Sequence, residues 1–236
     1  MRNLITFLAL SMLATVGMAG HEVEHDVASS QSAHVVANVG AAINTGMGAD
    51  EVTAEVLNSV NTLDMTVRTV GADVDPDVSA SQRAGLVLNA GVASNTHLSG
   101  DDITTDVVNS VNTASVTSRT DGFGADSDVY VAQSAYGVAN LGAAISANLG
   151  GNDIDTSVLN SVNTADVTSR VRAGGLGDTS AVGVTQRASG VVQGGLSVTA
   201  GVAADDVATS VTNAVNTSSI TSTLRSGPPV SGPPAQ

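Results

Sequence analysis

The pentapeptide NSVNT occurs at 58–62, 109–113 and 160–164, and a variant, NAVNT, occurs at 213–217. A Gln-x-Ala triplet begins 27 residues before each copy, and its glutamines are Gln31, Gln82, Gln133 and Gln186. Successive copies start 51, 51 and 53 residues apart. Such a period indicates stacked structural units. We therefore expect four repeats of about 51 residues, covering 31–81, 82–132, 133–185 and 186–225.

Each repeat contains two stretches with the alternation of a β-strand, for example 133–145 and 158–170. In the first, we expect one dry face made of Gln133, Ala135, Gly137, Ala139, Leu141, Ala143 and Ile145. In the second, a row from Val158 to Arg170 alternates with a row from Leu159 to Ser169. Apolar residues every four positions at 103–111 leave a helix as an alternative, but the density of β-branched residues favours strands. The expected fold is an all-β solenoid of amyloid-like, stacked strand-turn-strand units.

Stacking the repeats would align equivalent amide side chains, each able to donate to one neighbour and accept from the other. The expected ladder rows are Asn58, Asn109, Asn160 and Asn213; Asn61, Asn112, Asn163 and Asn216; Asn38, Asn89, Asn140 and Gln193; and the four glutamines. The sequence leaves open whether each repeat forms one rung or two. Two rungs would place equivalent residues about 9.6 Å apart, which is too far for direct contact between their amides.

The composition excludes several classes of function. Only 2% of the residues are aromatic and 13% are charged, while 42% are hydrophobic, which argues against a densely packed enzyme core. The chain has no Cys, so it forms no disulfide and no thiolate site. Eight Arg, no Lys and a net charge of −14 make nucleic acid an unfavourable partner.

The two ends differ in composition from the repeats. Residues 1–19 have the basic start, short apolar run and small residues of a secretory signal peptide, which predicts a secreted chain without a transmembrane anchor. Residues 20–30 form an acidic, His-containing leader, in which His21 and His25 suggest either a Cu or Ni chelate or a plain solvated segment. Residues 226–236 are a Pro-rich, extended tail.

These features resemble a known group of fibre proteins. Curlin repeats carry Gln, then Gly two residues later, then Asn; Gln133, Ala135 and Asn140 keep that order with Ala for Gly and a longer gap. Over 31–222 the chain is similar to the secreted functional-amyloid subunits of bacteria, curlin and the FapC-like proteins, although its repeat is longer and it lacks a CxxC pair. The resemblance implies self-association into extracellular fibres for a biofilm matrix or surface attachment, with a nucleator or an outer-membrane export partner.

Carboxylates recur at one place in each repeat. They are Asp50, Glu51, Asp101, Asp102, Asp153, Asp205 and Asp206. Such a column suggests either solvated turns or calcium held between turns, since calcium takes oxygen ligands. No His recurs in register and no GxSxG motif is present, so we expect no enzymatic activity.

Two further columns leave alternatives open. Arg68, Arg119 and Arg170 suggest strand-end charges that pair with Asp or guard an edge. Thr62, Thr113, Thr164 and Thr217, with Thr66, Thr117, Thr168 and Thr221, suggest either ordinary strand residues or a surface that binds ice or carbohydrate. The main alternative to a fibre subunit is a monomeric secreted solenoid that acts as an adhesin or ligand-binding module, stiffened by calcium.

Overall fold

The computed structural model describes residues 9–18, 23–24, 26–72, 74–97, 100–173, 179–201 and 204–226. The fold is all-β: no helix occurs in these ranges, and hence none that could cross a membrane. The strands are β1 (Ala9–Met18), β2 (Val23–Glu24), β3 (Val27–Gly46), β4 (Ala49–Ala72), β5 (Val74–Asp75), β6 (Asp77–His97), β7 (Gly100–Phe123), β8 (Asp128–Asn148), β9 (Gly151–Ala173), β10 (Ala181–Ser189), β11 (Val192–Gly201) and β12 (Ala204–Ser226).

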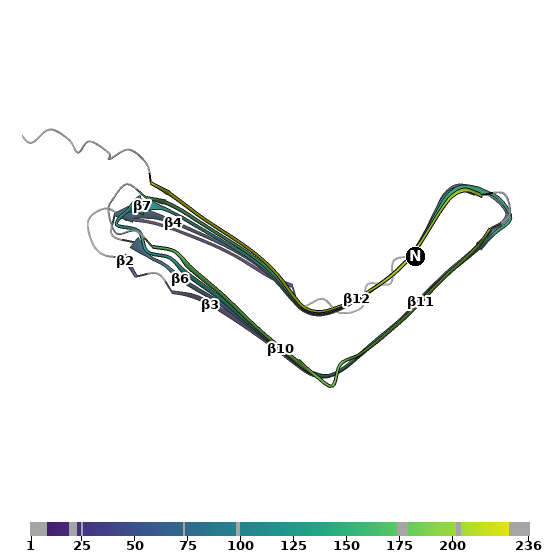
Figure 1. The fold of residues 1–236 in the computed structure, drawn as a ribbon, viewed down its shortest axis with the longest axis horizontal. Coiled ribbons are helices and arrows are strands. Elements are labelled where there is room, and N and C mark those ends of the chain that lie inside the picture. Colours follow the sequence, from purple (N-terminus) through teal and green to yellow (C-terminus); the bar gives the residue numbers. More distant parts are fainter. Residues whose placement is uncertain are drawn as a thin grey trace, which may run out of the picture.

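The long strands form two parallel sheets that lie face to face (Figure 1). The inner sheet has the order β1-β4-β7-β9-β12, and the outer sheet has the order β3-β6-β8-β10, with β11 also paired to β8. A repeat places one strand in each sheet, so equivalent residues of successive repeats are direct neighbours. The rung number that the sequence leaves open is therefore one, and the segment 103–111 belongs to strand β7 rather than to a helix.

Both sheets bend at the same level, which gives the cross-section a V shape (Figure 1). We call the two halves the β10 arm and the β11 arm after the outer strands they contain. One residue per strand has a positive φ at the bend; these are Asn61, Asn112, Asn163 and Asn216 in the inner sheet and Val35, Leu86, Gly137 and Gly190 in the outer sheet. Asn and Gly tolerate this left-handed region, whereas Val and Leu are strained there.

The bend also exchanges the two faces of each strand. Ala135 faces the core before the corner residue Gly137, and Val138 faces it afterwards. The single dry face expected over 133–145 is therefore wrong beyond the corner, where Leu141 and Ile145 are 44% and 36% exposed. Residues 158–170 behave in the same way, because a left-handed residue breaks the two-residue period of a strand.

The core is a thin seam between the sheets. In the β11 arm, a glycine row of the outer sheet faces a valine row of the inner sheet, and a Cβ placed on Gly142 would lie 2.5 Å from Val158 Cγ1 and 3.2 Å from Val107 Cγ1. The outer strands β6, β8 and β11 each lie between two inner strands in this arm, so the sheets are staggered. The close approach requires Gly, because any side chain there would overlap a valine methyl group.

Candidate functional site

The Asn58 row runs through the core as a continuous hydrogen-bonded ladder. Nδ2 of Asn58 donates to Oδ1 of Asn109, Asn109 to Asn160, and Asn160 to Asn213, each over 2.9 Å. The same nitrogens donate across the seam to carbonyls of the outer sheet, as Asn109 does to Leu141 at 3.1 Å. The row thus joins consecutive rungs and also joins the two sheets.

The Asn61 row forms a second ladder at the corner, where its residues adopt the left-handed conformation. Asn61 donates to Asn112, Asn112 to Asn163, and Asn163 to Asn216, over 2.8–2.9 Å. The amides also donate to outer-sheet carbonyls, including Asn112 to Ser134 at 2.8 Å. The second Asn of NSVNT therefore bends the chain, and its side chain fixes the bend.

The Gln row runs in the opposite direction. Nε2 of Gln82 donates back to Oε1 of Gln31, Gln133 to Gln82, and Gln186 to Gln133, each over 2.8 Å. Each of these three nitrogens also reaches a corner carbonyl of the inner sheet at 2.6 Å. The Gln row accepts toward the C-terminal end of the stack, whereas the Asn58 and Asn61 rows donate toward it.

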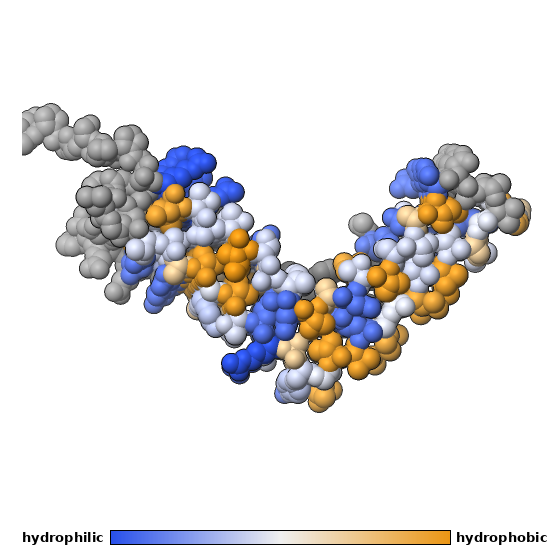
Figure 2. All heavy atoms as spheres, in the orientation of Figure 1, coloured by the Kyte–Doolittle hydropathy of each residue, from blue (hydrophilic) through white to orange (hydrophobic). Residues whose placement is uncertain are grey.

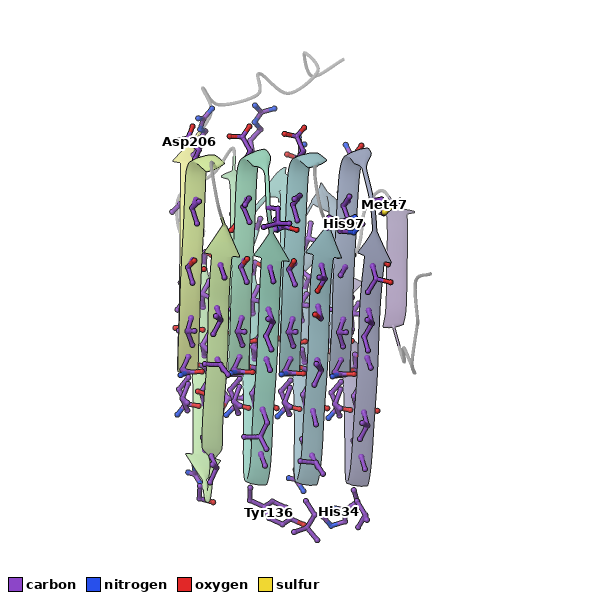
Figure 3. The ribbon with its side chains drawn as sticks, turned by 90° about the vertical axis from the view of Figure 1, so that its right-hand side faces the viewer. His34, Met47, His97, Tyr136 and Asp206 are labelled. Carbon is purple, nitrogen blue, oxygen red and sulfur yellow. The ribbon has the colours of Figure 1, made fainter. Side chains whose placement is uncertain are left out.

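The Asn38 row is a ladder over three rungs only. Asn38 donates to Asn89 at 3.0 Å and Asn89 to Asn140 at 3.1 Å. The ladder stops at Asn140, which donates to the carbonyl of Ser161, as Gln193 donates to that of Ala214, each over 3.2 Å. Figure 3 shows such side chains at matching heights on successive strands. The structure therefore brings together all fifteen residues expected in the ladder rows: Gln31, Gln82, Gln133, Gln186, Asn38, Asn89, Asn140, Asn58, Asn109, Asn160, Asn213, Asn61, Asn112, Asn163 and Asn216.

Among the described residues, none forms a layer over the core at the C-terminal end of the stack. The inward row of β12 is 43–51% exposed and consists of Val207, Val211, Val215, Ile220 and Leu224. The equivalent row of β9 is at most 2% exposed and consists of Ile154, Val158, Val162, Val167 and Val171. Figure 2 looks onto this end and shows hydrophobic residues along both arms. In the described part of the chain, β12 is the last strand of its sheet, and Asn213 and Asn216 accept ladder bonds but donate none.

The N-terminal end is different. Strand β1 pairs in parallel with β4, from Ala9 opposite Thr62 to Met18 opposite Gly71. Residues 9–18 of the expected signal peptide therefore lie along the β4 edge in the β10 arm. The rest of that segment, His21 and His25 of the leader, and residues 227–236 of the tail lie outside the described residues.

The acidic column lies on strands rather than in turns. Glu51, Asp102, Asp153 and Asp206 are register neighbours on the exposed face of the inner sheet, so the expectation of turn positions is wrong for them. Asp50, Asp101 and Asp205 belong to the same strands, but the description does not extend to their side chains. Among described residues, no three His, Cys, Asp or Glu side chains form a group that could hold a metal ion.

Arg68, Arg119 and Arg170 lie three or four residues before the C-terminal ends of β4, β7 and β9, and none of these three strands is at a sheet edge in the described part of the chain. Arg68, Arg119 and Arg170 are register neighbours on the open face of the inner sheet in the β10 arm, and Arg172 and Arg225 form a second column beside them. The expectation that they guard an edge is wrong, whereas the expected pairing with Asp holds for two of them. Asp121 Oδ2 lies 2.9 Å from Arg119 Nε and 3.8 Å from Arg68.

The two expected threonine columns do not form one continuous surface. Both Thr columns lie in register on the concave side of the V, separated by a row that contains Asp64 and Asp166.

His34 Nε2 lies 2.7 Å from the hydroxyl of Tyr136, two rungs away, because Gly85 leaves room between them (Figure 3). His97 is 8% exposed, and neither of its ring nitrogens has a partner among the described residues.

An apolar face on the outer sheet was not expected from the sequence. In the β11 arm, nine large side chains that are 36–69% exposed alternate with Ala, Gly, Ser and Thr; they are Val39, Ile43, Leu88, Val92, Leu141, Ile145, Val192, Leu196 and Val198. The four strand segments that carry them, 37–45, 88–96, 139–147 and 192–200, contain no charged residue. The sequence pattern did not predict this surface, because the strands change face at the corner and residues assigned to the core lie on the outside.

No protein-family model, no curated protein and no solved structure matches the chain. The functional interpretation therefore depends on the contacts of the chain itself. Its most distinctive site is the open C-terminal rung, where a hydrophobic row and two amide ladders end together.

Proposed function

We propose that the protein is a structural fibre subunit that stacks end to end, with the first rung of one copy added to the last rung of another. The exposed inward row of β12 is the observation that carries this proposal. An edge strand whose backbone groups and core row are both open is a template for another chain. A secreted fibre of this kind would suit a biofilm matrix or surface attachment.

The two ends of the stack are chemically complementary. At the C-terminal end, Asn213 and Asn216 point donors outward, whereas the direction of the same rows leaves Oδ1 of Asn58 and Asn61 as the acceptors toward the next copy. The reversed Gln row would be continued by Gln31 donating to Gln186. A head-to-tail contact therefore extends all three ladders, whereas two like ends would place donor against donor.

Burial supplies the driving force for this contact. Each of the five exposed side chains of β12 would lose the remaining half of its accessible surface, which contributes on the order of 1 kcal/mol per side chain. The stagger supplies the matching shape, because Gly40 of the next copy would lie beside Val211 as Gly91 lies beside Val56, whose Cγ1 would be 3.1 Å from a Cβ placed on Gly91. The backbone of β12 gains a full ladder of hydrogen bonds in the same step.

The first experiment follows assembly of protein that lacks residues 1–19 by electron microscopy, thioflavin fluorescence and mass per length. The full chain has a mass of 23.3 kDa, so the shortened chain of about 21 kDa, on four rungs of about 4.8 Å, predicts about 1.1 kDa per Å for a single filament. Fibre diffraction should show the same rung spacing along the axis. Protein that stays monomeric at every concentration would rule out the fibre proposal.

A residue-level test uses Asn213→Asp, which changes the open rung only. The carboxylate has no N–H to donate to Asn58 of the next copy, so elongation should slow at least about tenfold while the monomer keeps its stability. Thr212→Asp is the matched control, because this neighbour is exposed on the other face of the same strand. The triple change Asn109→Asp, Asn160→Asp and Asn213→Asp should abolish assembly through stacked charge. Unchanged elongation in both ladder variants would exclude the amide contact.

A monomeric adhesin is the second candidate, and the apolar outer face of the β11 arm is the observation that favours it (Figure 2). Exposed apolar surface of this extent is typical of interaction sites. Under this alternative, Leu141→Ser with Ile145→Ser should reduce adsorption of monomers to hydrophobic beads. Leu159→Ser is the control, since Leu159 is 38% exposed on the other sheet. Equal adsorption of both variants would exclude the adhesin alternative.

A further inference from the structure

The positive charge of this acidic chain is gathered in one place. Five of its eight arginines lie on the open face of the inner sheet in the β10 arm: Arg68, Arg119, Arg170, Arg172 and Arg225. Four of them, with Asp121, Val171 and Thr223, line a cavity of 340 Å³. Figure 2 shows a strongly hydrophilic patch along the upper edge of this arm. We call this surface the arginine groove.

The arginine groove is incompletely neutralised by the protein. Asp121 accepts from Arg119 at 2.9 Å and lies 3.8 Å from Arg68. Within the described ranges, no carboxylate lies within ion-pair distance of Arg170, Arg172 or Arg225. These three cations occupy neighbouring positions on adjacent strands, where like charges repel. An anionic ligand would relieve that repulsion.

We propose that the arginine groove binds an acidic polysaccharide through its carboxylates. The parallel register repeats arginine at the strand spacing of about 4.8 Å along the stacking axis, which suits a polymer with one carboxylate on each sugar ring. Planar guanidinium groups bind carboxylates with two parallel hydrogen bonds, which a Lys cannot do. The chain contains Arg and no Lys.

The charge of the whole chain separates this ligand from nucleic acid. Double-stranded DNA carries one negative charge per ~1.7 Å of its axis and is repelled by a protein of low pI. The chain has a net charge of −14, and its acidic column lies on the same sheet in the other arm. A uronate polymer carries fewer negative charges per unit length than DNA. It can therefore bind the local arginines with less repulsion from the acidic remainder of the protein surface.

The test measures binding of short polygalacturonate oligosaccharides to the monomer by calorimetry, before any assembly, so that it is independent of the fibre proposal. Arg170→Gln with Arg172→Gln should weaken binding about tenfold or more. The matched control is Arg83→Gln with Arg187→Gln, which removes the same charge from exposed positions on the outer sheet and should leave binding unchanged. Added NaCl should weaken binding to the wild-type chain.

Two further measurements, on a Lys variant and on DNA binding, test the proposal. Arg170→Lys with Arg172→Lys keeps the charge but removes the paired hydrogen bonds, so its affinity should fall between wild type and the Gln variant. Equal binding of double-stranded DNA and polygalacturonate would contradict the assignment to a carboxylated polysaccharide. Absence of polygalacturonate binding, or an equal loss in the Arg83 and Arg187 control, would contradict a site in the arginine groove.

Discussion

Strands β9 and β12 share one pattern of residues but lie in different surroundings. Val162 of β9 is fully buried, whereas Val215, its register partner in β12, is 43% exposed. The difference arises from position alone, because each inner strand needs an outer strand on both sides and β12 has only one. A core in this protein is therefore completed by the next repeat, and the last repeat lacks that neighbour.

The largest expected effect compares these two valines directly. Val162→Asp places a charge in the seam and should lower the free energy of unfolding by more than ~3 kcal/mol. Val215→Asp should change the stability of the monomer by less than ~0.5 kcal/mol, since the site is half exposed, but should stop elongation. Urea unfolding and seeded growth measure the two effects. Equal destabilisation by both substitutions would contradict an open last rung.

The second test compares the two ends of the stack. Strand β1 occupies the β4 edge, so seeds of the chain with residues 1–19, supplied with monomers that lack these residues, should add partners at their C-terminal end only. Removal of these residues should free the β4 edge and permit growth at both ends. Two-colour fluorescence microscopy of seeds distinguishes the cases. Growth at both ends with β1 present would show that β1 does not protect this edge.

The third test compares rungs at their corners. The last rung has Gly190 at the outer corner, whereas an interior rung has Leu86 with a φ of 53°. Leu86→Gly should stabilise the fold by about 1 kcal/mol by relieving backbone strain. Leu88→Gly, two residues along the same strand, should destabilise it by about as much, because extended backbone gains nothing from Gly. Thermal unfolding measures both, and a loss of stability in Leu86→Gly would contradict strain at the corner.

The smallest expected effect concerns an incomplete ladder. His97 and Asn148 are register neighbours, and the backbone N–H of His97 donates to Asn148 Oδ1 at 3.1 Å. His97→Asn replaces two unpaired ring nitrogens by an amide that can bond to Asn148, which should add up to ~1 kcal/mol of stability. His97→Ala, which offers no amide, should not. Equal stability of the two variants in chemical denaturation would exclude the side-chain bond.

Much of this arrangement was predictable because the repeat fixes register. Once Asn58 pairs with Asn109, every other amide of the two repeats is placed, and the ladder rows follow from spacing alone. The corner of the outer sheet was not predictable, because neither Val35 nor Leu86 is a residue that favours a positive φ. The error at this one position reversed the faces beyond it, so the apolar outer face was taken for core.

If the protein forms the proposed fibre, the corner also determines which chains can join it. A partner must bend where the arms meet, because a straight strand laid on β12 could follow one arm and would leave the other (Figure 1). Mixed growth with unrelated flat β-stacks is thereby disfavoured without any clash of charge or side-chain size. Under the fibre proposal, the angle of the V would restrict assembly to chains that have the same bend.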